Sequence, residues 1–577
     1  MNPNEVIRLK TGPRRMRGAL AFCFIVLSIF GLRLVQLQAL DAPQLAAAAA
    51  EKRTRTLVLP AQRGEITDRK GAPFAITVDA RDITVDQKMV TDPIASANAI
   101  SQITGVDVNT LIPELTGDRR FNYVLKKVTP EHWAKIKELK LPGIFSEKTT
   151  KRIYPANTLA SSTIGFVGGE DKGLAGLEFG FDSELAGSPG EVITEISAGG
   201  RPLPAGIASE KKPVPGMGIR LTLDRDLQFV AEQSLAAKVE FAQADSGTLV
   251  AISPKTGKIL ALATYPTFDA NKPSEAKPGV TVNHALVDAY EPGSTAKVMT
   301  IAGLLNEGDA NPSTAFTIPS ALKRSGKFFR DHEPHGTLKL TLTGVLAKSS
   351  NIGTIQAAEI MGAEKFNEYL LKFGVGQVTG MQFPGESKGR LPKLDKWSGT
   401  SFPTFAFGQG YMVSAVQIAS MYATIANDGV RINPSLIEGY IMPNGEYQQA
   451  SDPIKTEVIS VAAAKTLREM METVVSDEGT APLAEIPGYR VAGKTGTAQV
   501  VDPECRCYSR EVIASFIGMA PAENPEIVVA VAIHNPKNGR YGGQLAGPVF
   551  KEVAQYSLKQ MNIPPSNGKP TGYPVEW

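Results

Sequence analysis

The chain has 577 residues, so two or more domains are expected, because a single hydrophobic core rarely grows so large. With 42% hydrophobic and 21% charged residues, and 61 Lys and Arg against 58 Asp and Glu, the composition is that of a globular protein and indicates neither a disordered chain nor a nucleic-acid binder. Three cysteines and five histidines are too few for a disulfide scaffold or a zinc module, and we expect chemistry without a metal or cofactor.

The N-terminus carries a basic segment followed by an apolar one. Residues 1–17 contain five cations and one acid, and residues 18–32 carry no charge. Arg33 can snorkel while apolar residues continue beyond it, which gives enough length to span a bilayer. We therefore expect a cytoplasmic N-terminus at 1–17, a single-pass plasma-membrane anchor at 18–37, and all later residues on the outer face. The alternative is a signal peptide cleaved near the alanine run 46–50, which lies far from the apolar stretch for ordinary processing.

A non-catalytic module is expected at residues 38–200. Helix formers lead into short strand-like runs, such as 83–85 and 123–125. The charged segment 63–71 is interpreted as a buried ion-pair network between domains rather than a second active site. Residues 201–219 are rich in Pro and Gly, lack apolar periodicity, and are predicted to be a linker.

Residues 220–562 are predicted to form an α+β domain. Strands at both ends with helices between them indicate that the terminal strands meet in one sheet. The Pro- and Gly-rich residues 563–577 are predicted to be a flexible tail. The expected strands are 247–252, 258–264, 514–519 and 527–533, and a helix is expected over about 548–561.

A serine with a lysine three residues later can act as nucleophile and base without histidine or metal, because both side chains share a helix face. Of five such pairs, only Ser294 and Lys297 precede an apolar helix, which ends at Gly308. At that N-terminus the amide dipoles favour developing negative charge, and burial would lower the pKa of Lys297. The alternative is a serine N-cap with the lysine in water. The other four pairs begin at Ser209, Ser274, Ser320 and Ser566.

Two further patterns follow in chain order, Ser349-Ser350-Asn351 and Lys494-Thr495-Gly496-Thr497. Each is common alone, and the order of all three is the informative feature. The set resembles a class B penicillin-binding protein, a monofunctional peptidoglycan D,D-transpeptidase, and is most similar to the division-type (FtsI-like) branch. Ala296 is a departure, since many relatives carry a bulky Phe or Met there. The resemblance also includes segments 63–69, 173–178, 221–224, 290–293 and 407–410.

The resemblance implies a transmembrane helix, an elongated mostly-β pedestal of the dimerisation type, and a transpeptidase domain whose antiparallel sheet is flanked by helices, as in serine β-lactamases. It implies that Ser294 attacks a stem-peptide carbonyl while Lys297 takes its proton. Ser349 would relay a proton to the leaving amine, and Asn351 would bind Lys297 and the substrate amide. The N–H groups of Ser294 and Thr497 would form an oxyanion hole. The implied substrate-binding residues, on an edge strand, are Lys494, Thr495, Gly496 and Thr497.

The implied partners are stem peptides as donor and amine acceptor, β-lactams, a glycan polymerase of the SEDS type and other division proteins at the septum. Three alternatives remain: a β-lactamase or penicillin-sensing receptor, an elongation-type transpeptidase, and a division scaffold with a vestigial site. A β-lactamase would need a base for deacylation, and the sequence shows none that we can assign. Residues 331–335 are interpreted as structural rather than metal-binding. Cys505 and Cys507 are either free thiols or a strained bridge.

Overall fold

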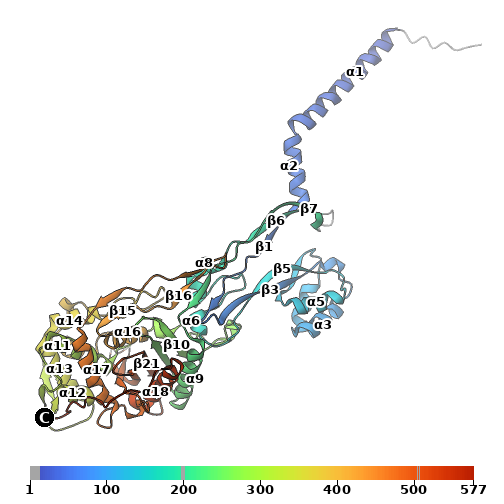
Figure 1. Ribbon diagram of the computed structural model, residues 1–577. Coiled ribbons are helices and arrows are strands. Elements are labelled where there is room, and N and C mark those ends of the chain that lie inside the picture. Colours follow the sequence, from blue (N-terminus) through green and yellow to red (C-terminus); the bar gives the residue numbers. More distant parts are fainter. Residues whose placement is uncertain (1–12, 197–201, 503–504, 506) are drawn as a thin grey trace, which may run out of the picture. The chain divides into compact units, whose positions relative to one another are not determined.

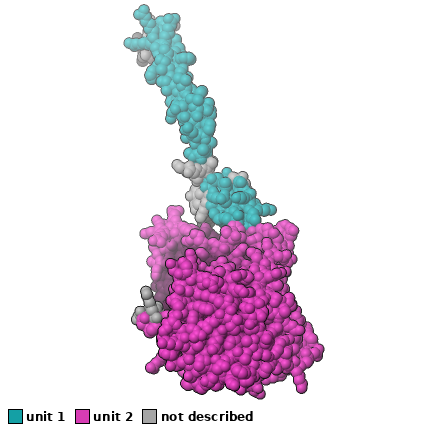
Figure 2. All heavy atoms as spheres, turned by 90° about the vertical axis from the view of Figure 1, so that its left-hand side faces the viewer, with its two compact units in different colours: residues 1–61, 188–214 teal, residues 62–187, 215–577 magenta. Residues whose placement is uncertain are grey.

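The computed structural model describes residues 13–196, 202–502, 505 and 507–577 (Figure 1). They divide into two compact units, one from residues 1–61 and 188–214 and the other from residues 62–187 and 215–577 (Figure 2). The first unit thus combines the N-terminal region with a segment from much later in the chain. The second unit contains every predicted catalytic and substrate-binding residue.

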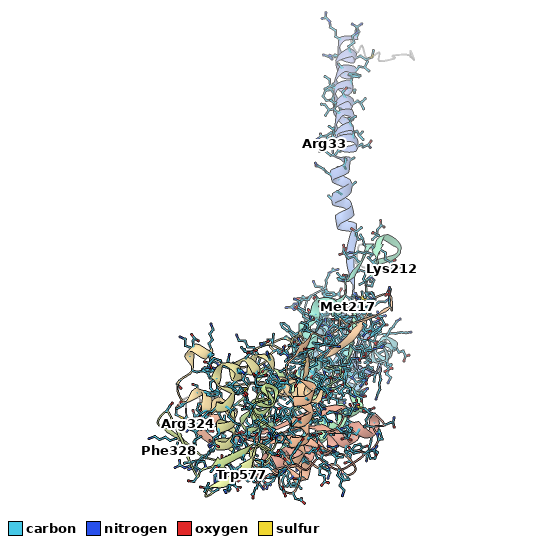
Figure 3. All side chains as sticks on the ribbon, turned by 60° about the vertical axis from the view of Figure 1, so that its left-hand side comes forward. Arg33, Lys212, Met217, Arg324, Phe328 and Trp577 are labelled. Carbon is cyan, nitrogen blue, oxygen red and sulfur yellow. A yellow bond between two sulfur atoms is a disulfide. The ribbon has the colours of Figure 1, made fainter. Side chains whose placement is uncertain are left out.

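The first unit contains the expected apolar helix. Helix α1 spans Pro13–Val35 and continues through η1, a π-helical turn at Gln36–Leu40, so the helix exceeds the predicted anchor at both ends. These 28 residues are long and apolar enough to cross a membrane, and none of the side chains of α1 is buried. Near the end of α1, Arg33 Nη1 donates to Gln36 Oε1 at 2.7 Å (Figure 3). Helix α2 follows at Ala42–Arg53.

The segment predicted to be a linker, 201–219, contains strands. Strand β7 covers Pro202–Lys211 and pairs antiparallel with β6 (Gly190–Ile196), which pairs with β1 (Thr54–Leu59). Strand β8 then begins at Gly218. The linker prediction is therefore wrong. The sheet is held by pairing between backbone groups, which the Pro- and Gly-rich composition does not reveal.

The non-catalytic part of the second unit combines strands with three longer helices and three helices of four or five residues. Strand β3 pairs antiparallel with β4 and β5, which confirms the strand character predicted for 83–85 and 123–125. A small separate core forms around Ile83, Ile100 and Leu111. The elements are β3 (Pro73–Val85), β4 (Asn122–Val128), β5 (Ile144–Ile153), α3 (Pro93–Thr104), α4 (Val108–Leu115) and α5 (Pro130–Glu138).

The sheet of this part continues into strands from much later in the chain. Its order is β17-β16-β8-β2-β3-β4, with β5 on β3. Strand β8 links the early and late strands of this sheet, because it pairs with β2 on one side and with β16 on the other. The proposed boundary near residue 220 therefore cuts a continuous sheet. The additional strands are β2 (Ile66–Thr67), β8 (Gly218–Leu221), β16 (Ile437–Ile441) and β17 (Tyr447–Gln449).

The charged segment 63–71 contributes Arg63 to a buried ion-pair network, but the buried pairs lie within the non-catalytic part, and the lysine of the pair that reaches the catalytic domain is half exposed. Arg63 Nε lies 2.6 Å from Glu178 Oε2, and Arg152 Nε lies 2.7 Å from Glu178 Oε1. Lys70 Nζ reaches Asp224 Oδ2 at 2.9 Å, which ties this segment to the start of the catalytic domain. The ion pairs therefore join parts of the second unit that lie far apart in sequence.

The catalytic domain is built on a five-stranded antiparallel sheet of order β10-β9-β21-β20-β19. Strands from both ends of the domain meet in it, as predicted. Residues 527–533 of β21 are all buried, so helices cover both faces of the sheet. The strands are β9 (Ser246–Ile252), β10 (Ile259–Tyr265), β19 (Ala492–Val501), β20 (Tyr508–Ala520) and β21 (Ile527–His534), and the contacting helices are α9 (Arg225–Phe241), α16 (Ala415–Ala426), α17 (Val461–Val475) and α18 (Gly542–Gln560).

Helix α18 begins six residues before the predicted start near residue 548. Its first turn contains Gly542, where an added Cβ would lie 1.9 Å from Ser515 O and 2.6 Å from Gly496 O. Glycine therefore allows the helix to lie directly on the sheet, and low helix propensity concealed this turn.

The remaining elements are α6 (Ser161–Ile164), α7 (Gly176–Gly180), α8 (Asp182–Ala186), α10 (His284–Val287), α11 (Lys297–Glu307), α12 (Leu342–Ala347), α13 (Asn351–Met361), α14 (Ala363–Lys372), α15 (Ser401–Ala406), β11 (Ala315–Ile318), β12 (Leu322–Arg324), β13 (Lys327–Phe329), β14 (Leu338–Thr341), β15 (Val430–Ile432), β18 (Lys455–Glu457), and the short 3-10 turns η2 (Gln87–Met89), η3 (Pro273–Glu275), η4 (Gly293–Ala296), η5 (Leu394–Lys396) and η6 (Pro482–Ala484).

The C-terminal residues 563–577 pack against the catalytic domain, so the prediction of a flexible tail is wrong. Thr341 N donates to Val575 O at 3.0 Å, and the side chain of Val575 is buried. Trp577 Nε1 donates to Phe316 O at 3.1 Å (Figure 3). An added Cβ on Gly344 would lie only 1.9 Å from Val575 O. Proline and glycine prevent a helix here but not an extended segment held by backbone hydrogen bonds.

Candidate active site

Ser294 lies where a tight turn enters the central helix of the catalytic domain. The 3-10 turn η4 carries Ser294 and leads directly into α11, whose residues 297–304 are all buried. The helix ends at Gly308 in the left-handed conformation, as its sequence predicts. Gly293 has φ +55°, and an added Cβ there would lie 3.0 Å from Ala498 Cβ on β19. Glycine thus lets the serine turn approach the edge strand.

The second motif lies between α12 and α13. Ser349 has φ +58°, and Ser350 caps α13 by accepting from Gly353 N at 2.9 Å. Asp331 accepts from Ser350 Oγ at 2.7 Å and from Ile352 N at 2.9 Å. The carboxylate of Asp331 therefore holds the loop that presents Ser349, which agrees with the structural role expected for residues 331–335.

The third motif lies on β19, the edge strand of the sheet, as predicted. Lys494 and Thr495 are buried, and Thr495 Oγ1 lies 2.7 Å from Thr480 Oγ1. An added Cβ on Gly496 would lie 2.9 Å from Thr295 Cγ2, so only glycine permits this contact with the serine turn. Thr497 is half-buried on the same strand, one residue before Ala498.

The hydroxyl of Ser349 joins the three motifs. Lys494 Nζ lies 2.9 Å from Ser349 Oγ, and Lys297 Nζ lies 3.3 Å from the same atom. Lys297 Nζ also donates to the carbonyl oxygen of Ser349 at 2.5 Å. Residues separated by nearly 200 positions thus share one hydroxyl, which can pass a proton between two amines.

Both amines are buried without a carboxylate in salt-bridge contact among the described residues. Burial lowers the pKa of Lys297 to about 7, although the charge of Asp331 acts in the opposite direction. Burial, together with the charge of Lys297, holds the pKa of Lys494 well below its usual value. The site therefore supplies a neutral amine near pH 7, as a general base requires.

Asn351 has a different partner from the one that the resemblance implies. Its Nδ2 donates to Arg330 O at 3.0 Å, and Lys297 is hydrogen-bonded to Ser349 instead. Asn351 therefore anchors the segment that precedes Asp331, and the expected contact with Lys297 is wrong in this structure. The short side chain at the first position of α13 reaches the neighbouring loop rather than the buried amine.

Three contacts around Glu291 were not identified as part of the site from the sequence. Glu291 Oε1 accepts from Gly410 N, and Oε2 accepts from Tyr508 OH, both at 2.9 Å. Gly293 N donates to Gly408 O at 2.9 Å. The 407–410 segment and the start of β20 therefore brace the serine turn. The position of Glu291 beside Pro-Gly-Ser is a sequence signal for this role, whereas Tyr508 carries none.

Cys505 and Cys507 form a disulfide in the connection between β19 and β20. The sequence left free thiols and a bridge as alternatives, and the structure selects the bridge. Within the described ranges, no group of three or more His, Cys, Asp or Glu side chains is placed to hold a metal.

Comparisons with known proteins give consistent similarities. Residues 247–555 match the family described as penicillin binding protein transpeptidase domain, and residues 58–221 match the penicillin-binding protein dimerisation domain. Penicillin-binding protein PbpB of Mycolicibacterium smegmatis is 34% identical over 96% of this chain and 92% of its own length. Peptidoglycan D,D-transpeptidase FtsI of Escherichia coli is 32% identical over 94% of this chain and 91% of its own length.

Solved structures show the same similarity. Apo penicillin-binding protein 3 of Mycobacterium tuberculosis superposes with a TM-score of 0.72 at 30% identity, covering 90% of this chain and all of that one. The same protein in complex with aztreonam gives a TM-score of 0.71 over the same coverage. The similarity therefore extends over both the non-catalytic part and the catalytic domain.

Proposed function

The chain belongs to the class B penicillin-binding proteins, and from this premise we propose that it is a peptidoglycan D,D-transpeptidase with Ser294 as its nucleophile. The observation that carries the assignment is the Ser349 hydroxyl shared by the buried amines of Lys297 and Lys494. A lysine with only a structural role on a core helix would form an ion pair with a carboxylate or extend its amine to water. The amines of Lys297 and Lys494 are instead buried together beside a serine turn.

In the proposed reaction, the neutral amine of Lys297 accepts the proton of Ser294 Oγ as that oxygen bonds to the carbonyl carbon of the penultimate D-Ala. The C–N bond then breaks, the terminal D-Ala takes up a proton through Ser349, and an acyl-enzyme remains. The backbone N–H groups of Ser294 and Thr497 stabilise the oxyanion. An amine from a second stem peptide attacks the ester, releases Ser294 and completes the cross-link.

The edge strand β19 is the proposed substrate platform. An extended stem peptide can pair with its free edge, and Gly496 allows close approach of the backbone. The hydroxyls of Thr495 and Thr497 hold the terminal carboxylate, and Lys494 supplies positive potential when that carboxylate arrives. A β-lactam would enter by the same route and acylate Ser294.

We further propose a single-pass topology with the catalytic domain outside the cytoplasm. The five cations before residue 18 favour a cytoplasmic N-terminus, and α1 is long enough to span the bilayer. Relatives named FtsI and stage V sporulation protein D, together with the division-type resemblance of the three motifs, support a role in division. As part of the same proposal, the protein acts at the septum with a SEDS-type glycan polymerase. Localisation of a fluorescent fusion in dividing cells separates this role from elongation, in which the fusion would follow the lateral wall.

Intact mass of the detergent-solubilised protein, followed over time with penicillin, tests the central assignment. We expect a stable gain of one penicillin mass, which Ser294→Ala abolishes. Ser320→Ala is the matched control, because Ser320 begins another Ser-x-x-Lys pair outside the site. Labelling of Ser294→Ala would overturn the assignment. Rapid loss of the adduct would instead favour a β-lactamase, and absence of labelling in the parent would favour a scaffold.

A further inference from the structure

The C-terminal residues 563–577 form a strap that is anchored on the catalytic domain at both of its ends. At its start, Ser566 N donates to Gly488 O at 2.9 Å, and Ser566 Oγ accepts from Arg490 N at 2.9 Å. Gly488 and Arg490 lie just before β19, the strand that carries Lys494. The C-terminal strap is therefore fixed first to the approach of the third motif.

The other end of the C-terminal strap contacts the beginning of α12, beside which Figure 1 marks the C-terminus. Thr341 N donates to Val575 O at 3.0 Å, and Thr341 Oγ1 donates to Pro574 O at 2.5 Å. The same hydroxyl caps α12, because it accepts from Gly344 N at 3.0 Å. Two carbonyl groups of the strap thus orient the residue with which α12 begins.

The last residues of the strap are closely packed. An added Cβ on Gly344 would lie 1.9 Å from Val575 O, so this carbonyl rests on the backbone of α12 itself. Trp577 Nε1 donates to Phe316 O of β11 at 3.1 Å, and Lys339 Nζ of β14 lies 4.9 Å from the centre of the Trp577 ring. The chain end is therefore held against α12 and against both strands beside it.

Helix α12 is short and leads directly to Ser349. It has six residues, all of which are buried, and a helix of this length depends on its cap and its packing to stay in place. Directly after it, Ser349 N donates to Leu346 O at 3.2 Å. Because Thr341 precedes Ser349 by only eight residues, a shift at the cap is expected to move the Ser349 hydroxyl.

We propose that the C-terminal strap is a positioning element for Ser349. By tying α12 to the approach of β19, it keeps Ser349 Oγ at 2.9 Å from Lys494 Nζ and 3.3 Å from Lys297 Nζ. Proton transfer through a hydroxyl needs hydrogen-bond distances of this kind, and a misplacement of about 1 Å can cost about 10²-fold in rate. The inference rests on the proposed function, in which Ser349 passes a proton to the leaving amine.

The test compares the full chain in detergent with a chain that ends at Tyr573. Stopped-flow acylation by penicillin separates the dissociation constant of the noncovalent complex from the acylation rate constant, and titration of labelled sites corrects for unfolded protein. We expect deletion of residues 574–577 to lower the rate constant about fivefold or more and to leave the dissociation constant within about twofold. A strap with a purely structural role would lower the melting temperature and leave the rate constant per labelled site unchanged.

Substitutions at Thr341 test the same contact in a chain of full length. Thr341→Val removes the hydroxyl that joins the strap to α12 and should lower the acylation rate constant about threefold or more, whereas Thr341→Ser retains the hydroxyl and should restore it. Tyr573→Phe is the matched control, because the Tyr573 hydroxyl donates to Glu469 Oε2 at 2.9 Å on α17, which carries no motif residue. It should react at the parental rate.

A parental rate constant in the shortened chain or in Thr341→Val, or an equal loss in Tyr573→Phe, would overturn the proposal. If the shortened chain does not fold, the difference between Thr341→Val and Thr341→Ser decides. Absence of labelling in the parent would refute the proposed function instead, so the two failures are distinguishable.

Discussion

Two clusters of buried charge in the second unit are built in opposite ways. In the non-catalytic part, the carboxylate of Glu178 is fully buried between Arg63 and Arg152, at 2.6 Å and 2.7 Å. Burial alone would lower the pKa of Arg63, but Glu178 and Asp182 outweigh it and raise that pKa. At the active site, Lys297 and Lys494 are equally buried and share only a hydroxyl.

The difference shows how one fold uses burial for two purposes. Opposite charges that are buried together remain ionised and hold distant segments in place. Like charges that are buried together cannot both stay ionised, so the pair yields a neutral amine at ordinary pH. The first arrangement contributes to structure and the second to reactivity, and changes at the two clusters should therefore affect different measurements.

The largest effect is expected at Lys297. Lys297→Met keeps the length of the side chain but removes the base, and should lower the rate constant of penicillin acylation about 10³- to 10⁴-fold, roughly 4–5.5 kcal/mol of barrier. Resistance to unfolding should not fall much, because the amine that is removed is buried without a carboxylate partner, although its hydrogen bonds to Ser349 are lost as well. Stopped-flow acylation and thermal melting measure the two. Lys348→Met, at an exposed neighbouring lysine, is the control, and a loss below tenfold in Lys297→Met would argue against a general base here.

The reverse pattern is expected at Glu178. Glu178→Gln leaves Arg63 and Arg152 without their carboxylate and should lower the free energy of unfolding by about 3–5 kcal/mol, measured by urea denaturation. The folded fraction should still be acylated at Ser294. Asp182→Asn is a milder control because Asp182 is about a third exposed. Intact stability together with lost acylation in Glu178→Gln would contradict the division of roles.

The pH dependence of acylation tests the neutral amine directly. With the pKa of Lys297 at about 7, the acylation rate constant should rise about tenfold between pH 6 and pH 8 as the amine loses its proton. The lowered pKa of Lys297 also determines whether stability rises or falls with pH. Because the pKa is lower in the folded state than its usual 10.5, the unfolded chain binds more protons between about pH 7 and 10.5, and this group increases stability with pH there. A flat acylation profile would exclude Lys297 as the titrating base.

Much of the catalytic domain could be predicted from the sequence because its signals are local. The run from Val298 to Leu305 predicts a buried helix, and the apolar strands at 514–519 and 527–533 predict a central sheet, as the structure confirms. The order of three short motifs indicated one site, and the structure brings Ser349, Lys297 and Lys494 together.

The wrong predictions concern segments whose structure depends on distant partners. Strand β7 and the C-terminal residues around Val575 are held by backbone pairing, which leaves no periodicity in their own sequence. The side-chain amide of Asn351 donates to Arg330 O. Tyr508 OH donates to Glu291, which lies more than 200 residues earlier in the chain. Motifs indicate which side chains gather, but hydrogen-bond partners depend on loop conformations that sequence patterns do not encode.

The smallest effect is expected at Asp331. Its substitution tests the comparison of the two buried-charge clusters, because it changes the charge near the active-site amines without removing an amine. Asp331 is the carboxylate whose charge raises the pKa of Lys297 against the effect of burial. Asp331→Asn should therefore lower the midpoint of the acylation profile by about 0.5–1 pH unit, or roughly 0.7–1.4 kcal/mol. Asparagine can still accept from Ile352 N through Oδ1, so the loop that carries Ser349 is expected to persist.

The measurement is the pH profile of acylation in the parent and in Asp331→Asn, with Glu333→Gln as a neighbouring control that has no assigned contact to the amine. A lower plateau with an unchanged midpoint would mean that Asp331 acts only by holding the loop, and a raised midpoint would contradict the charge argument. A lowered midpoint with the plateau retained would show that one carboxylate limits how far burial depresses Lys297. An ion pair between Lys297 and a carboxylate, like those of Glu178, would keep the amine protonated and abolish the base. Asp331 makes no such ion pair, because its carboxylate accepts hydrogen bonds from Ser350 Oγ and Ile352 N instead.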